Sequence, residues 1–351
     1  PPPPRRRLPR PPRSTPQPHR RQRQMCIRDR LKAAIQKKFA RENNLVYETS
    51  QLVVTCGAKQ ALFNLCIALL GPGDEAIVPA PYWVSYPDMV RLAEAEPVIV
   101  RGGIEQDFKI TPEQLTAALS DQTRLIFLNS PCNPTGASYS ESEMQALGAT
   151  LGDYPDVVIV ADDIYEHIHW DDQPFVSMAA ACPALADRIV TTNGVSKAYA
   201  MTGWRIGYAA GPEALIRAMI TVQSQSTTNP CSVSQAAAVA ALTGDQTCIA
   251  EMVKAYRARH DYVVPALNAI PGFECRPGEG TFYAFPRVQQ AIEACGLEDD
   301  VEFTEFLLNE ADVAVVPGTA FGAPGYIRLS FACAMEDLEE SVQRINRAVP
   351  A

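Results

Sequence analysis

The chain has 351 residues, enough for about two domains with a sizeable buried core. Its 47% hydrophobic and 20% charged residues are typical of a soluble globular protein, and no apolar run reaches the roughly 18 residues that a membrane helix requires. Residues 1–30 hold ten of the 31 basic residues and one of the 40 acidic residues. The rest of the chain is therefore strongly acidic and unsuited to binding nucleic acid.

The ten cysteines show no Cys-x-x-Cys spacing, which argues against a zinc site and against a disulfide framework. His167 and His169 alternate along the chain but lack a third ligand, so we interpret them as structural or solvated. We therefore expect no metal and a reducing, cytoplasmic environment.

Residues 1–30 contain nine prolines and almost no aliphatic side chains, which predicts disorder. A nucleic-acid tail, a transit peptide and a linker are three interpretations. The prolines forbid the amphipathic helix of a transit peptide. A fourth interpretation, which we favour, is an artefact of the gene sequence or a truncation.

A predicted helix over 31–44 leads to a short strand at 51–56 and to the turn Gly57-Ala58-Lys59. A long apolar helix follows over 61–70. A glycine turn between a strand and a helix N-terminus can bind phosphate, because unpaired N–H groups and the helix dipole point at the anion. Alone this pattern is weak, and Lys59 could equally be a solvated residue of the first helical turn.

Four apolar segments, 76–78, 97–100, 125–128 and 157–161, predict the buried strands of a mostly parallel sheet. Thr111-Pro112 marks the start of a helix between the second and third of them. Polar or aromatic residues follow three of these strands, where open α/β sheets bind ligands. These residues are Trp83 after the first strand, Asn133 in Asn133-Pro134-Thr135-Gly136 after the third, and Asp162, Asp163 and Tyr165 after the fourth.

A strand at 188–192 runs into a turn of small residues that contains Lys197, and Arg205 follows eight residues later. A lysine amine forms a Schiff base with a carbonyl and becomes reactive near neutrality when burial or a nearby cation lowers its pKa. The arginine offers a planar fork for a phosphate. Together they suit a cofactor that bears both an aldehyde and a phosphate.

Helices at 211–225, 232–242 and 251–270 precede a region with strands at 281–285, 313–316 and 326–331 and a final helix at 335–349. Arg328 lies in the middle of the last strand between apolar neighbours, so it requires a partner. We expect a large domain over 31–235 and a small α+β domain over 236–351 that includes the linking helix.

The segment from Gly194 to Gly207 resembles the lysine signature of the class I, fold-type I aminotransferases, and the resemblance extends from about Leu31 to the C-terminus. It implies an α/β fold, with a mostly parallel mixed sheet flanked by helices and a smaller C-terminal α+β domain. It also implies the cofactor pyridoxal 5′-phosphate (PLP) and a homodimer with shared active sites.

The resemblance assigns Lys197 to the Schiff base with PLP and to proton transfer, and Asp162 to the pyridine nitrogen. Asn133 and Tyr165 would donate to the phenolic oxygen, and Trp83 would stack on the ring. The turn Gly57-Ala58-Lys59 and Arg205 would bind the phosphate. Arg328 would bind the substrate α-carboxylate, with Asn133 and Trp83 beside the substrate. The two X-Pro bonds near Asn133 are candidates for cis geometry.

These roles imply transfer of an amino group between an L-amino acid and 2-oxoglutarate or a similar keto acid. If Lys59 binds the side-chain carboxylate of the substrate, as in some similar enzymes, the amino acid is aspartate or glutamate. Aromatic or prephenate-type substrates are the alternative. Rival interpretations are a β-lyase on the same fold, a ligand-sensing regulator, or a truncated and catalytically impaired aminotransferase. The last arises because no residue matches the family's N-terminal segment, which contacts the substrate carboxylate and the partner subunit's cofactor.

Overall fold

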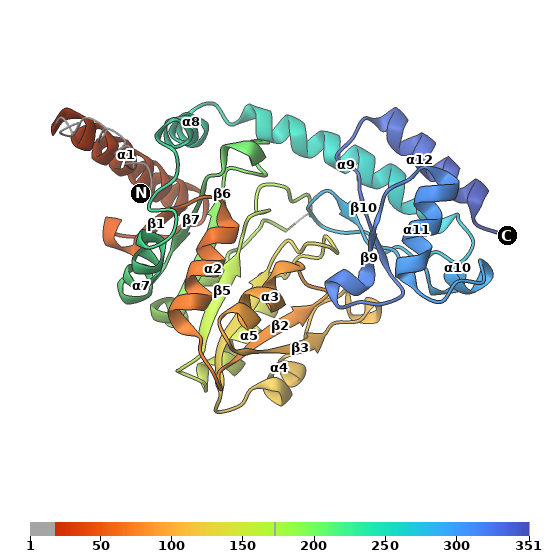
Figure 1. The fold of residues 1–351 in the computed structure, drawn as a ribbon, viewed down its shortest axis with the longest axis horizontal. Coiled ribbons are helices and arrows are strands. Elements are labelled where there is room, and N and C mark those ends of the chain that lie inside the picture. The colour runs from red at the N-terminus through yellow and green to blue at the C-terminus, as the bar shows by residue number, and fades with distance from the viewer. Residues whose placement is uncertain (1–17, 172, 351) are drawn as a thin grey trace, which may run out of the picture.

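The computed structural model describes residues 18–171 and 173–350, and of residues 18–26 the backbone alone. Two sheets form the framework, a large one built from residues 52–210 and a small one built from residues 283–330. The long helix α9 (Thr247–Asn268) runs along one side from the first part to the second (Figure 1). This arrangement confirms the predicted α/β fold class with a smaller C-terminal α+β part.

Helix α1 (Pro18–Glu42) begins earlier than expected, so the prediction of disorder was wrong for residues 18–30. All nine prolines of this segment lie at or before position 18. Proline is tolerated at the first helical position because the N–H it lacks would have no helical partner there. Residues 1–17, the remainder of the segment predicted to be disordered, lie outside the described residues.

The large sheet has the strand order β1-β7-β6-β5-β4-β2-β3. Its strands are β1 (Leu52–Thr55), β2 (Glu75–Ala80), β3 (Glu96–Arg101), β4 (Thr123–Asn129), β5 (Val158–Asp162), β6 (Ile189–Gly194) and β7 (Gly207–Ala210). Strands β2 to β6 pair in parallel, whereas β7 is antiparallel to both β6 and β1. The carboxyl ends of the parallel strands therefore lie along one edge, as the sequence predicted.

Helices cover both faces of this sheet, because successive strand residues point to opposite sides. Val78 packs in the cluster that includes α2 (Ala58–Leu69), α3 (Ser85–Leu92) and α7 (Glu213–Ser224). Its neighbour Ile77 packs in the opposite cluster, with α4 (Pro112–Ala118), α5 (Glu141–Gly152) and α6 (Met178–Ala181).

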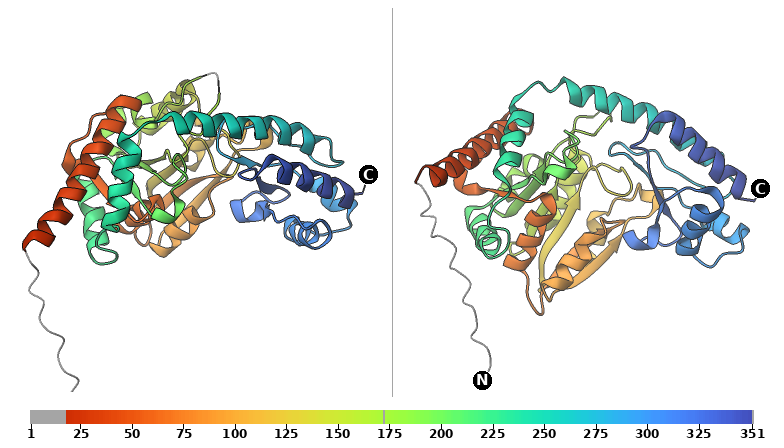
Figure 2. Two further views of the ribbon diagram at one scale, coloured as in Figure 1. Left: turned by 90° about the horizontal axis from the view of Figure 1, so that it is seen from above. Right: turned by 45° about the horizontal axis from the view of Figure 1, so that its top comes forward.

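Helix α8 (Ser232–Thr243) packs against α1, and its Ala238 and Leu242 share a buried cluster with Leu31 and Ile35. The expected domain boundary at residue 235 falls inside this helix. Since α8 packs on the first part of the chain, we propose a boundary between α8 and α9 instead. Figure 2 shows α1 and α8 together at one end of the molecule and α9 leaving toward the other.

The second part of the chain combines a three-stranded antiparallel sheet with helices. Its elements are β8 (Tyr283–Ala284), α10 (Gln289–Ala294), α11 (Asp300–Ala311), β9 (Val316–Pro317), β10 (Ile327–Ser330) and α12 (Met335–Ala348). Residues of α9, α11 and α12 enclose its own apolar core around Phe303 and Leu338. Within the described residues, no helix is both long and apolar enough to cross a membrane.

Candidate active site

A cavity of about 430 Å³ lies at the carboxyl ends of β4, β5 and β6 and reaches the start of α2. Nine of the ten residues to which the family resemblance assigns a role line it. They are Ala58, Lys59, Trp83, Asn133, Asp162, Tyr165, Lys197, Arg205 and Arg328. The tenth, Gly57, is the residue immediately before α2. Residues far apart in the sequence thus meet in one place.

Asp162 ends β5 with its carboxyl group buried beside the cavity. The Tyr86 hydroxyl donates to its Oδ2 at 2.6 Å, while its buried Oδ1 has no hydrogen-bond partner. Burial raises the pKa of this carboxyl to about 6, although the Tyr86 hydrogen bond and the Lys197 charge lower it. The open oxygen is suited to a cationic N–H donor from a bound group.

Asp163, the alternative acid in the sequence, does not line this cavity. Its backbone N–H donates to the Thr192 carbonyl at 2.9 Å, and its side chain is 1% exposed. Burial, followed by the negative charge of Glu166, raises the pKa of Asp163 to about 8. Alternation along the chain at the end of β5 therefore leaves Asp162 as the acid available to a ligand.

The Asn133 loop is fixed by Asn129, the last residue of β4. The Asn129 side chain donates to the Asp162 carbonyl at 2.8 Å and accepts from the Asn133 backbone N–H at 2.8 Å. Of the two X-Pro bonds near Asn133, Ser130–Pro131 is cis, and Ala80–Pro81 near Trp83 is also cis. Asn133 and Asp162 are thereby tied to the same strand ends.

Lys197 projects into the cavity with its Nζ 5.6 Å from the centre of the Tyr165 ring and 5.5 Å from that of Phe282. Partial burial, together with the positive charges of Arg328 and Arg205, lowers the pKa of its ammonium, while Asp162 opposes this effect. A lowered pKa gives the neutral amine that carbonyl chemistry requires.

The start of α2 and Arg205 form an anion cradle. Gly57 precedes the helix with φ 84° and provides no side-chain cap, which leaves the first N–H groups of α2 available. A Cβ on Gly57 would collide with the Arg205 guanidinium. Arg205 itself is held by the Thr202 carbonyl at 3.0 Å. Glycine is favoured here because its φ lies in the left-handed region, and a side chain at this position would also displace the Arg205 guanidinium.

Lys59 and Trp83 form one wall of the cavity. The Lys59 Nζ lies 4.8 Å from the centre of the Trp83 ring, a cation–π distance. Trp83 also meets Tyr86 edge-on, with ring centroids 5.5 Å apart. Lys59 is exposed, and its ammonium lies at the rim of the cavity over the Trp83 ring.

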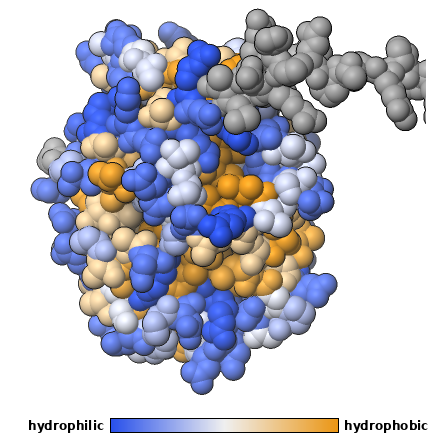
Figure 3. All heavy atoms as spheres, turned by 90° about the vertical axis from the view of Figure 1, so that its left-hand side faces the viewer, coloured by the Kyte–Doolittle hydropathy of each residue, from blue (hydrophilic) through white to orange (hydrophobic). Residues whose placement is uncertain are grey.

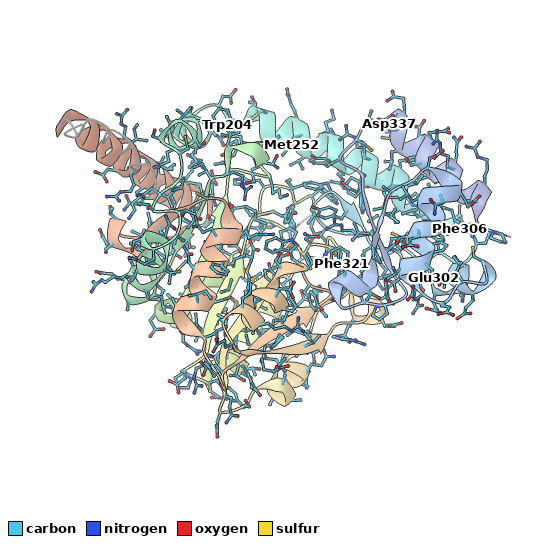
Figure 4. All side chains as sticks on the ribbon, in the orientation of Figure 1. Trp204, Met252, Glu302, Phe306, Phe321 and Asp337 are labelled. Atoms are coloured by element: carbon cyan, nitrogen blue, oxygen red, sulfur yellow. The ribbon has the colours of Figure 1, made fainter. Side chains whose placement is uncertain are left out.

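Arg328 reaches the cavity from β10 in the second part of the chain. Its Nη1 donates to the Asn133 Oδ1 at 2.9 Å, and its buried Nε has no hydrogen-bond partner. Its guanidinium lies 4.4 Å from the centre of the Tyr283 ring and 4.8 Å from that of Phe321. Figure 4 shows Phe321 on the side of the second part that faces the large sheet.

Sequence reasoning missed several cavity residues, among them Tyr86, Asn129, Ser196 and Tyr283. Tyr86 lies three residues after Trp83 on α3, a helix that was not predicted. Asn129 and Ser196 are each within four residues of a chosen position, so proximity to the motifs could have identified them. Tyr283 shares a hydrogen bond of 3.2 Å with the Tyr165 hydroxyl, a contact that only the fold creates.

The family model for class I and II aminotransferases matches residues 18–345. The aspartate/prephenate aminotransferase of Nitrosomonas europaea is 52% identical over 321 residues, which cover 90% of this chain and 81% of the relative. The crystal structure of the Rhizobium meliloti aspartate aminotransferase superposes with a TM-score of 0.88 at 44% identity, covering 94% of this chain and 87% of that one. The structure of the Thermus thermophilus aspartate aminotransferase with maleate superposes with a TM-score of 0.85 at 41% identity, covering 91% of this chain and 81% of that one.

Proposed function

Because the chain belongs to the class I and II aminotransferases and is an amino-acid transaminase, we propose that it holds PLP in the cavity around Lys197. One observation carries this proposal. A single cavity contains an amine of lowered pKa, a buried carboxylate with an unpartnered oxygen, and the cradle formed by Gly57 and Arg205. These three features match the aldehyde, the pyridine nitrogen and the phosphate of PLP.

The remaining cavity residues fit the same cofactor. Trp83 would offer its indole to the ring, and Asn133 and Tyr165 would donate to the phenolic oxygen. Bound there, PLP supplies an aldehyde that links to amines and a ring that accepts electrons from the substrate Cα. Asp162 would keep the ring nitrogen protonated, because an anionic carboxylate favours the cation beside it.

Lys197 would act as the base that moves the substrate proton. Its Nζ lies in the cavity, and its lowered pKa leaves an amine able to accept a proton from Cα and return it nearby. Arg328 would orient the substrate by binding its α-carboxylate with the two nitrogens of the guanidinium fork. The hydrogen bond that Arg328 makes to Asn133 places that fork beside the proposed cofactor contacts.

We propose a dicarboxylic amino acid, aspartate or glutamate, as the amino donor, with 2-oxoglutarate as the acceptor. Lys59 supports this choice because its charge lies over Trp83 at the cavity, where a second carboxylate would need a cation. The Thermus thermophilus enzyme, solved with maleate, shows a dicarboxylate accompanying a protein of similar fold. Prephenate-type or aromatic substrates are the second candidate, since the Nitrosomonas europaea relative is an aspartate/prephenate aminotransferase.

The chain is also proposed to act as a homodimer, in line with the family resemblance. Figure 3 shows apolar residues gathered on the face that carries α1, α2 and α7. Exposed apolar side chains occur on or near these elements, including Val46, Ile67 and Ile220. A second copy of the chain is the occupant that would cover such a face.

A coupled assay tests the function and the substrate together. The protein with PLP, aspartate and 2-oxoglutarate should form oxaloacetate and glutamate in equal amounts. Lys59→Met should raise KM for aspartate by about ten-fold or more, because a charge-assisted contact is lost. KM for phenylalanine should stay unchanged and serves as the internal control.

The same assay separates the rival functions. Keto-acid formation from the amino acid without 2-oxoglutarate, on every turnover, would indicate a β-lyase. Preference for prephenate over 2-oxoglutarate as the acceptor would support the second candidate. Absence of turnover with PLP bound would indicate an impaired enzyme.

A further inference from the structure

A buried ion network lies behind the cavity and takes no part in the proposed chemistry. Lys38, on α1, has a fully buried side chain whose ammonium pairs with the Glu166 carboxylate. The Lys38 ammonium also donates to Asn43 Oδ1 at 2.7 Å and lies 3.5 Å from Glu42. A lysine buried this completely is unusual and is tolerated because two carboxylates and an amide oxygen surround its ammonium.

Both oxygens of Glu166 accept hydrogen bonds from amides. Asn193 Nδ2 donates to Oε1 at 2.7 Å, and Asn43 Nδ2 donates to Oε2 at 2.8 Å. Burial alone would raise the pKa of Glu166, but the charges of Lys38 and His167 and the surrounding hydrogen bonds lower it. Glu166 is therefore an anion whose oxygens are occupied from several sides.

The network ends next to two cavity residues. Glu166 directly follows Tyr165, and Asn193 lies near the end of β6, four residues before Lys197. Asn193 Oδ1 accepts from the Gly194 backbone N–H at 2.7 Å, which fixes the chain as it leaves the strand. Movement of Asn193 would thus be transmitted to the segment that carries Lys197.

We propose that Lys38 and Glu166 are positioning residues that hold the end of β6 at Asn193 and Gly194, and through it Lys197, in the geometry needed for proton transfer. A buried ion pair adds little net stability relative to an apolar pair, because desolvation offsets the attraction. A fully satisfied polar network does, however, restrict its members to one arrangement. Displacement of a reacting group by about 1 Å can cost on the order of 100-fold in rate.

Metal binding explains this group of residues less well. Glu42, Glu166 and His167 offer ligand atoms within 4.8 Å of one another. The Lys38 ammonium contacts both of these carboxylates, so the chain itself supplies the cation at this position. Glu42 additionally pairs with Arg41 and His167.

The first test compares Lys38→Met with Lys37→Met, an adjacent change on the exposed side of α1. Hydrogen exchange is measured on the protein without cofactor, in peptides that cover residues 190–198. Lys38→Met should speed exchange in these peptides relative to Lys37→Met and lower kcat about ten-fold or more, with KM for aspartate changed less than about two-fold.

A second variant separates positioning from stability, because Lys38→Met leaves a buried carboxylate without its cation. Lys38→Met/Glu166→Gln removes both charges, but the amide introduced at position 166 has a single acceptor oxygen for the two asparagine donors. The double variant should therefore recover most of the unfolding midpoint that Lys38→Met loses relative to Lys37→Met, because no uncompensated charge stays buried at position 166. Exchange in residues 190–198 should stay fast and kcat should stay low.

Full recovery of exchange and kcat along with the midpoint would overturn the proposal, and so would a loss of activity that matches the unfolded fraction. The inference rests on the cofactor role proposed for Lys197. The exchange measurement on the cofactor-free protein does not depend on that role. Failure of the positioning proposal can therefore be distinguished from failure of the cofactor proposal.

Discussion

Asp162 and Asp163 are adjacent at the end of β5, but their side chains point in opposite directions and have different surroundings. Asp162 lines the cavity with one open oxygen, whereas Asp163 is buried outside it. The pKa of Asp163 is raised to about 8, so at neutral pH its carboxyl group is protonated in the folded chain. An asparagine resembles this neutral acid in shape, but it cannot supply the charge that we assign to Asp162.

Replacement of the two acids should therefore have opposite consequences for activity. Asp162→Asn removes the anion beside the proposed ring nitrogen and should lower kcat by at least about 100-fold. Asp163→Asn is the matched control and should retain kcat within about three-fold, because it replaces a group that is already neutral at pH 7. Steady-state aminotransfer from aspartate measures both. Equal losses in the two variants would show that the site depends on packing and not on the charge of Asp162.

The raised pKa of Asp163 also predicts how stability depends on pH. The unfolded chain ionises this group near pH 3.8, whereas the folded chain holds the proton until about pH 8. Stability is therefore present in full below pH 3.8 and is lost as pH rises toward 8. Asp163→Asn removes this loss of stability. Its thermal unfolding midpoint should therefore exceed that of the natural chain by more at about pH 9 than at about pH 5. Thermal unfolding at the two pH values measures the difference, and a gain independent of pH would contradict the assignment.

Sequence motifs identified nine of the sixteen residues that line the cavity, in part because the carboxyl ends of parallel strands share one edge. Asn133, Asp162 and Lys197 follow three neighbouring strands, so their meeting could be expected from the fold class. Tyr86 and Tyr283 could not be expected in this way. Tyr86 pairs with Asp162 and Tyr283 pairs with Tyr165, each far away in the sequence. No local sequence pattern predicts such a pair.

At the scale of elements, periodicity located the strands well but missed several helices. Helix α3 was missed because it is eight residues long and contains Pro87. Helix α5 was missed although Ser140 and Glu143 form a capping box that is readable in the sequence. For α4 the Thr111 cap and Pro112 were sufficient, and the structure confirms that start. End signals therefore matter more than propensity where a helix has few turns.

The start of α2 provides a test at this scale. Gly57→Ala would add a methyl group against the Arg205 guanidinium at a left-handed backbone position, and it should weaken PLP binding about ten-fold or more. Gly73→Ala is the matched control. Gly73 has φ 90°, but an added Cβ meets nothing within 4 Å, so only backbone strain of about 1 kcal/mol results. Quenching of tryptophan fluorescence gives both dissociation constants, and equal weakening would contradict the cradle.

At the scale of the whole molecule, the cavity depends on contact between the two parts of the chain. Arg328 of the small sheet reaches Asn133 of the large part, and the Tyr82 backbone N–H donates to the Phe321 carbonyl at 3.1 Å. The Gly280 backbone N–H donates to the Gly136 carbonyl at 3.0 Å, a further bond between the two parts. Binding of a substrate carboxylate by Arg328 would therefore require that the two parts keep this relative position.

Arg328→Lys tests this dependence with the charge retained. Lysine cannot form the two parallel hydrogen bonds of a guanidinium, so KM for aspartate and for 2-oxoglutarate should both rise about ten-fold or more. PLP affinity should not change, since Arg328 is assigned to the substrate. Arg344→Lys is the control, because Arg344 lies outside the cavity and pairs with Asp312 and Glu340 of the same part. A change in PLP affinity without a change in KM would reassign Arg328 to the cofactor.

The central claim is that Lys197 is the residue that binds PLP. The most direct measurement is borohydride reduction of the PLP-loaded protein followed by peptide mapping, with the visible absorption spectrum recorded before reduction. We expect a pH-dependent visible band, bleached by aspartate, and a single reduced adduct on Lys197. Absence of the band, or an adduct distributed over exposed lysines such as Lys37, would contradict the account.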